Sequence, residues 1–147
     1  MTECEAKRVG YIGQVTITHW VGEADDTSRA MAEFQYEAFL RCGEAMRPGV
    51  PLGHLVDVCA KLAEGTPYIC KPIAHGRGQG MDGPVLVYEA RDDRVKYWPI
   101  MENSTFMVKP VVFLPDGSKT VLWGDSVVVT PSGAKRLGKR LPPLIKA

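Results

Sequence analysis

The placement of helical and strand-like segments constrains the fold of this chain more than any single motif does. Apolar residues recur at helical spacing in two adjacent segments, residues 26–46 and 52–64. Asp26 or Thr27 can cap the first helix. The RPGVP segment between the helices ends the first, and Gly65 ends the second. The helices therefore form one block, and a sheet must be built from the residues before and after it.

Strand-like segments flank this helical block. They are rich in β-branched and aromatic side chains, and strand character returns after Gly65. The predicted strands are residues 11–21, 68–74, 85–90, 95–98, 105–114 and 120–130. A Pro-Asp-Gly turn at residues 115–117 separates the last two. This order predicts an α+β fold in which helices cover a mostly antiparallel sheet.

The overall composition is that of an ordinary globular chain. Hydrophobic residues make up 45% and charged residues 24% of the 147 residues, which suits one domain spanning residues 1–147. The formal net charge of +1 provides no global field that would attract nucleic acid or an anionic membrane. No apolar run approaches the ~20 residues needed to span a bilayer, and the N-terminus has no apolar signal segment. We therefore expect a cytoplasmic protein with neither a nucleic-acid nor a membrane partner.

Neither the cysteines nor the basic C-terminal segment indicates a specialised site. The cysteines are widely spaced and form no Cys-x-x-Cys pair, so we expect free thiols in a reducing compartment. They are Cys4, Cys42, Cys59 and Cys70. The basic segment at residues 134–147 lacks interleaved aromatic residues, and we interpret it as a solvated end of the chain.

The glycine-rich segment IAHGRGQGMDGPVLV, residues 73–87, is the most unusual local feature. Gly78, Gly80 and Gly83 match the G-x-G-x-x-G pattern of dinucleotide-binding loops, but that pattern must open a helix and here a strand follows. No Gly-Lys-Ser/Thr sequence follows, which excludes a P-loop. His75 has no second histidine nearby at metal-ligand spacing. Because glycines let a ligand approach closely, His75 is nevertheless a candidate functional residue.

Five segments resemble the motifs of a known superfamily in their order and spacing. They are GYIGQVTITHWVG at 10–22, MRPGVPLGHLVDVC at 46–59, AHGRGQGMDGP at 74–84, TFMVKPVVF at 105–113 and WGDSVVVTPSGAKRLGKR at 123–140. Together they resemble the pita-bread superfamily of methionine aminopeptidases, Xaa-Pro peptidases and creatinase. The resemblance implies a curved sheet with helices on one side. It covers the C-terminal part of that catalytic domain, so we expect a truncated pita-bread domain that lacks the N-terminal helices.

The resemblance also implies that most metal ligands of the superfamily have been lost. Its metallopeptidases hold two divalent metals with two Asp, one His and two Glu. His75 stands at the histidine position, and one Asp position falls near Glu3. The other positions fall on Gln14, Lys109 and Gly124. Because two divalent charges require anionic ligands, the resemblance implies no metal site, and we expect no other cofactor.

The resemblance places a set of polar residues at the former metal site. His75 would act as a general acid or base, while Lys109 and Arg77 would stabilise negative charge on a substrate or transition state. The candidate substrate-binding residues are Gln14, Thr16, Thr18, Gln79, Asp82 and Asp125. Lys109 is expected to pair with Asp125 or to bind a carboxylate. The alternative is a Lys109–Asp125 salt bridge that merely fills an inactive site.

Two functions remain open on the sequence alone. The first is a metal-independent, hydrolase- or lyase-like enzyme that acts on a small carboxylate- or amide-containing or peptide-like molecule; creatinase is the superfamily's example of C–N chemistry without a metal. The second is a non-catalytic binding or structural subunit. Because the N-terminal helices are missing, we expect either a homo-oligomer or a partner subunit that supplies the missing half.

Overall fold

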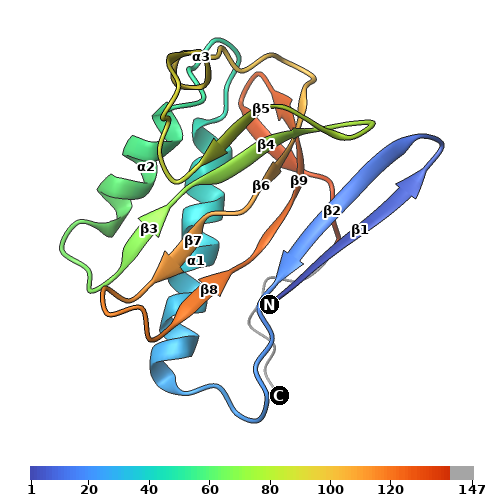
Figure 1. Cartoon of the computed structure of the whole chain (residues 1–147). Helices are drawn as coiled ribbons and strands as arrows, with labels where there is room; N and C mark the ends of the chain where they lie inside the picture. Colours follow the sequence, from blue (N-terminus) through green and yellow to red (C-terminus); the bar gives the residue numbers. More distant parts are fainter. Residues whose placement is uncertain (140–147) are drawn as a thin grey trace.

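The computed structural model describes residues 1–139, apart from the side chains of Met81 and Asp82. The chain opens with a hairpin, β1 (Thr2–Arg8) and β2 (Tyr11–Ile17), which is followed by helices α1 (Asp26–Ala45) and α2 (His54–Ala63) (Figure 1). The remaining elements are β3 (Ile69–Lys71), β4 (Ile73–Arg77), β5 (Met81–Val87), α3 (Asp93–Lys96), β6 (Thr105–Val108), β7 (Val111–Phe113), β8 (Thr120–Leu122), β9 (Gly124–Thr130) and β10 (Gly133–Arg136).

The strands form two antiparallel sheets that continue into one another. The larger sheet has the order β1-β2-β9-β6-β4-β5, with β10 also paired to β9, and the smaller has the order β3-β7-β8. The chain passes between the two sheets three times with only one or two intervening residues, from β3 to β4, from β6 to β7 and from β8 to β9. The result is a single curved antiparallel surface, which confirms the predicted α+β class and the curved sheet (Figure 1).

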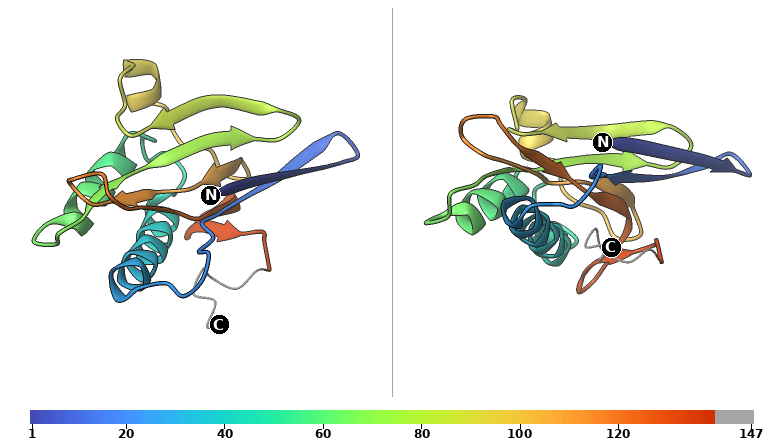
Figure 2. Two further views of the ribbon diagram at one scale, coloured as in Figure 1. Left: turned by 60° about the horizontal axis from the view of Figure 1, so that its bottom comes forward. Right: turned by 90° about the horizontal axis from the view of Figure 1, so that it is seen from below.

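Helices α1 and α2 lie on the same face of this surface, as expected (Figure 2). The side chain of Asp25 accepts a hydrogen bond from the backbone N–H of Ser28 (2.8 Å) and caps α1, one residue before the predicted cap. The buried side of α1 includes Phe39, whose ring packs edge-to-face on Trp123 with 4.8 Å between centroids. Burial of these apolar faces holds the helices to the sheet and leaves its other face free for polar residues. Within residues 1–139, none of the helices is long and apolar enough to cross a membrane.

Two local predictions were wrong, and one strand was missed. Residues 95–98 form no strand: the Asp92 side chain accepts from the Arg94 N–H (2.8 Å) and caps the short helix α3 instead. Strand β1 was not predicted at all. The basic segment after residue 133 is not simply a solvated end, because β10 pairs with β9 and contacts α1. Residues 140–147 of that segment lie outside the described residues.

The cysteines agree with the predicted free thiols. All four are free; Cys4 is exposed on β1, while the other three are buried. Cys42 of α1 and Cys59 of α2 face each other in the helical layer with 3.7 Å between their sulfur atoms. As predicted, both behave as small hydrophobic side chains of the core.

Candidate functional site

The strand registers bring most of the candidate residues onto the sheet face away from the helices. His75 of β4 pairs with Met107 of β6, which pairs with Ser126 of β9. Thr16 of β2 pairs with Gly124 of β9, two residues from Ser126. Opposed residues of antiparallel strands share a face, and so do residues two apart along one strand. His75, Thr16 and its neighbour Gln14 therefore lie on one face.

Glu3 is the centre of a hydrogen-bonded cluster on this face. Its Oε1 accepts from Gln14 Nε2 (2.6 Å) and from Thr16 Oγ1 (3.1 Å), and it forms an ion pair with Lys109. Gln14, Thr16 and Lys109 are buried, whereas the Glu3 side chain is half-exposed. The hydrogen bond from Lys109 holds the pKa of the Glu3 carboxyl below its usual 4.5. Glu3 therefore carries a full negative charge near neutral pH.

Arg77 forms a second ion pair a short distance along the same face. Its guanidinium pairs with Glu5 of β1 and also donates from Nη1 to the carbonyl oxygen of Gly80 (3.3 Å). The arginine is buried and Glu5 is half-exposed. The sequence did not reveal Glu5, because strand β1 was not predicted. Both cations expected to stabilise substrate charge thus already have a carboxylate partner.

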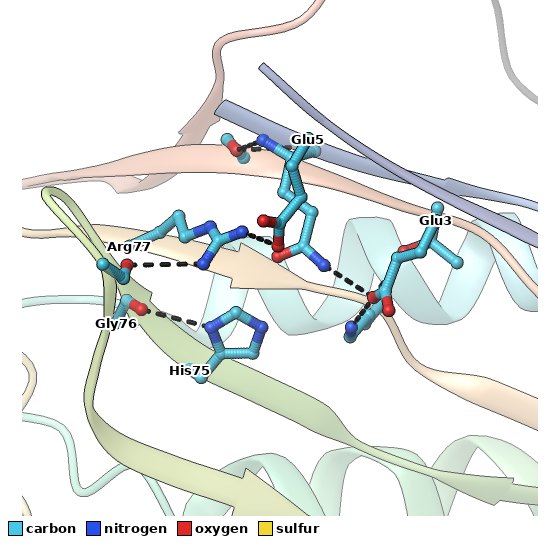
Figure 3. Close-up of polar contacts among 10 residues, drawn as sticks. Glu3, Glu5, His75, Gly76 and Arg77 are labelled. Carbon is cyan, nitrogen blue, oxygen red and sulfur yellow. Dashed lines mark hydrogen bonds and ion pairs between the residues drawn. The ribbon is translucent and has the colours of Figure 1, made fainter. Parts of the chain in front are cut away.

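His75 lies between these two ion pairs and is 4% exposed (Figure 3). Its Nδ1 is 3.1 Å from the carbonyl oxygen of Gly76, and since a carbonyl only accepts, Nδ1 carries the proton. Burial lowers the pKa of His75 below 6.5, and the positive charges of Lys109 and Arg77 lower it further. The ring is therefore neutral near pH 7, with an unprotonated Nε2.

A cavity of ≈ 660 Å³ adjoins this cluster beneath the β1–β2 hairpin. Its walls include Gln14, Arg77 and Asp125, but not Glu3, His75 or Lys109. Gln14 Oε1 and Arg77 Nε are buried without a hydrogen-bond partner among the described residues. The cavity is large enough to hold a small molecule.

Several candidate residues are not part of this cluster. Asp125 pairs with Arg136 Nε (2.8 Å) and not with Lys109, which corrects the expected salt bridge. The reason is register: Asp125 is opposite Val15 of β2 and therefore points to the helix side of the sheet. The Thr18 hydroxyl bonds the backbone of Leu122 on β8, as donor to its carbonyl (2.8 Å) and acceptor from its N–H (2.9 Å).

The two remaining candidates lie in and just after the connection between β4 and β5. Gln79 is exposed in the loop between these strands. Asp82 belongs to β5, but its side chain lies outside the described part of the structure. Neither prediction of a binding role is tested by the geometry.

The residues present do not fit a pair of divalent metals. Within the described residues, no group of three or more His, Cys, Asp or Glu side chains is close enough to share an ion. Lys109 occupies the space beside Glu3 with an ammonium group. Gly124 also leaves no room for a ligand, because a Cβ there would lie 2.3 Å from Lys109 Cβ and 2.4 Å from the Val108 carbonyl oxygen. A carboxylate at that position would require the neighbouring strand to move.

Comparison with known proteins identifies the family. The sequence profile of metallopeptidase family M24 matches residues 1–131. The chain belongs to this family. The fold is that of its solved structures: methionine aminopeptidase from Rickettsia prowazekii superposes with a TM-score of 0.77 at 19% sequence identity, over 91% of this chain. The pita-bread resemblance noted in the sequence is thus confirmed.

Further M24-like structures show the same arrangement. X-Pro aminopeptidase from Thermotoga maritima superposes with a TM-score of 0.76 at 21% identity, and prolidase from Pyrococcus furiosus with 0.74 at 24%. Each match covers 95% of this chain. The chain spans only 61% of the Rickettsia enzyme, 38% of the Thermotoga enzyme and 40% of the prolidase. Its fold is therefore that of a truncated pita-bread domain.

Proposed function

We propose that this M24 chain is a metal-independent, hydrolase- or lyase-like enzyme that acts on a small molecule with an amide or carboxylate group. The observation that carries the proposal is the state of His75. The ring is buried, Gly76 fixes its tautomer, and its Nε2 is an unprotonated base near neutral pH. A buried, neutral imidazole beside Lys109 and Arg77 is suited to general base catalysis, and Arg77 also lines a cavity of ≈ 660 Å³.

For an amide substrate, the proposed reaction is hydrolysis. Nε2 of His75 accepts a proton from water while the water oxygen attacks the carbonyl carbon. Arg77 and Lys109 stabilise the negative charge that develops on the carbonyl oxygen. The C–N bond then breaks, and His75 returns the proton to the departing nitrogen. No step requires a metal, in accordance with a site whose residues do not fit two divalent cations.

A second candidate function is that of a non-catalytic binding or structural subunit. The pairing of Lys109 with Glu3 and of Arg77 with Glu5 favours it, because each carboxylate weakens the ability of its cation to stabilise a developing charge. In either role, a second copy or a partner subunit would supply the part that this chain lacks relative to its larger relatives.

A turnover screen separates the two candidates. The purified protein, treated with a chelator, is incubated with a library of small amides and dipeptides, and the products are followed by mass spectrometry. The enzyme hypothesis predicts turnover that falls by about 10²- to 10⁴-fold in His75→Gln. The matched control is His54→Gln, since His54 is exposed on α2. The enzyme hypothesis is contradicted if the wild type turns over none of these compounds or if His75→Gln keeps the wild-type rate. Only the role as a binding or structural subunit would then remain.

A further inference from the structure

The two end strands of the larger sheet differ in how open their outer edges are. Strand β5 contains Pro84, which cannot donate a backbone hydrogen bond to a further strand. Strand β1 has no proline, all seven of its residues are exposed, and its outer edge pairs with no strand among the described residues. The β1–β2 hairpin extends from the sheet with this edge free along its length (Figures 1 and 2). An unpaired edge of this kind is a template for another strand.

The charges along β1 are arranged in two halves. The N-terminal half of TECEAKR carries Glu3 and Glu5, and the C-terminal half carries Lys7 and Arg8. An antiparallel copy of the same strand can set Lys7 of each chain opposite Glu5 of the other, whereas a parallel copy in register would set like charges together. Charged side chains ordinarily discourage strand addition at an edge, but opposite charges that face each other across two strands are stabilising. The β1 edge is therefore complementary to itself in the antiparallel direction.

Both halves have charge available for a second strand. The side chains of Glu3 and Glu5 remain 47% and 52% exposed in spite of their ion pairs with Lys109 and Arg77. Lys7 and Arg8 form no ion pair with the described residues, and both are exposed. Lys7 shares a face with Glu5 because the two residues are two positions apart.

We infer that β1 is a homodimerisation surface on which a second copy of this chain adds its own β1, antiparallel, to continue the sheet. The symmetric register that charge favours sets Lys7 of the second copy opposite Glu5, because the register with Lys7 opposite Glu3 also sets Glu5 opposite Glu5. Lys7 then reaches the sheet face that carries His75. The second copy contributes a cation at the rim of the cavity of each subunit.

The position of Cys4 makes this arrangement measurable. Cys4 is the exposed one of the four cysteines, so a thiol reagent labels the native protein at one strand position. A rise of ~3.4 Å per residue and a strand spacing of ~4.8 Å place the two Cys4 Cα atoms ~14 Å apart when Lys7 faces Glu5, and ~8 Å apart when Lys7 faces Glu3. These separations broaden the electron paramagnetic resonance spectrum of a nitroxide label through dipolar coupling.

The experiment combines light scattering with this spectrum. We expect a mass twice the 16.2 kDa of the chain and a broadened spectrum that narrows when labelled protein is mixed with excess unlabelled protein. The double variant Lys7→Glu/Arg8→Glu makes the charges of β1 wholly acidic and should weaken the dimer at least ~10-fold, because both Lys7–Glu5 contacts between the chains become repulsive. The matched control, Lys61→Glu on the exposed side of α2, should dimerise as the wild type does.

Three results would overturn the inference: a monomeric mass at all concentrations, a dimer without spectral broadening, or wild-type affinity in the β1 variant. Circular dichroism checks that the variant is folded. Lys7→Gln/Arg8→Gln, which removes the charges without adding acids, should shift the affinity in the same direction. The inference does not rest on the catalytic role of His75. A monomeric protein that hydrolyses amides would contradict the dimer inference but not the proposed enzymatic function. A dimer without activity would contradict the proposed enzymatic function but not the dimer inference.

Discussion

Lys109 and Glu3 form an ion pair that joins the region after β6 to the edge strand β1, although 106 residues separate them in sequence. The hairpin pairs with the rest of the sheet at Val15 with Asp125 and Thr16 with Gly124, and one further backbone hydrogen bond joins the Ile12 N–H to the Gly78 carbonyl oxygen (2.8 Å). The ion pair therefore anchors the hairpin. It also places an ammonium where the resemblance expects a bridging carboxylate.

Replacing Glu3 tests this anchor through its pH dependence. Because its folded pKa lies below 4.5, the Glu3 carboxylate stabilises the fold above that pH, and this contribution disappears as the pH falls through the lowered folded pKa. Glu3→Gln should lower the free energy of unfolding by about 1 kcal/mol near neutral pH, a small value because Glu3 is half-exposed. Urea unfolding near pH 7 should show the difference, and near pH 3 the difference should shrink. Glu23→Gln, at an exposed position in the turn before α1, should match the wild type at both pH values.

His75 should make the fold less stable in mild acid. Its folded pKa is below 6.5, so the unfolded chain binds a proton more readily than the folded chain does between these two values. The free energy of unfolding should be highest above about pH 6.5 and should fall by up to about 1.4 kcal/mol per pH unit below it. Denaturation midpoints across this range check the slope, which His75→Gln should remove and His54→Gln should retain. An NMR titration that gives His75 a pKa above 6.5 would contradict the assigned neutral ring.

Gly124 should not tolerate a side chain. The Cβ of Gly124→Ala would meet Lys109 Cβ at 2.3 Å and the Val108 carbonyl at 2.4 Å. We expect a loss of about 1–3 kcal/mol in the free energy of unfolding. The control is Gly13→Ala on β2, where a Cβ meets no atom within 4 Å, with an effect within about 0.5 kcal/mol. Equal denaturation midpoints for the two variants would show that β6 and β9 are less closely packed than described.

Arg136 should contribute more to stability than an exposed arginine does. It pairs with Asp125, which is 5% exposed, and its guanidinium lies over the Trp123 ring at 5.2 Å. Arg136→Met leaves the buried Asp125 carboxylate without its cation and should lower the free energy of unfolding by about 3 kcal/mol, as measured by thermal or urea unfolding. Arg94→Met breaks an exposed pair with Asp92 and should cost less than about 1 kcal/mol. If Asp125→Asn in the Arg136→Met background restores none of this stability, the unpaired charge of Asp125 is not the cause of the loss.

The sequence predicted the elements whose pattern reflects burial. Both helices were found because apolar residues such as Met31 and Leu55 repeat on one face. Strand β1 was missed because all its residues are exposed, so no alternation of apolar and polar residues marks it. That omission hid Glu5, and with it the neutralisation of Arg77. Residues 95–98 were misassigned because their β-forming side chains outweighed the cap at Asp92.

The sequence indicated which polar residues lie close together better than it indicated which of them form ion pairs with each other. The sequence brought His75, Arg77 and Lys109 together because each lies within a matched motif of one superfamily. The partner of Lys109 could not be deduced, because register alone decides which residues face each other. Val108, not Lys109, pairs with Asp125, and this turns the carboxylate toward Arg136 on the helix side.

The central claim is that a charge-balanced cluster around His75 has replaced the two metals of the family. Calorimetric titration of Mn²⁺ into chelator-treated, dialysed protein tests it most directly. We predict no saturable binding, because Lys109 and Gly124 stand at ligand positions and Glu3 is already paired. A saturable isotherm with two equivalents of Mn²⁺ per chain, lost in His75→Ala, would contradict the claim.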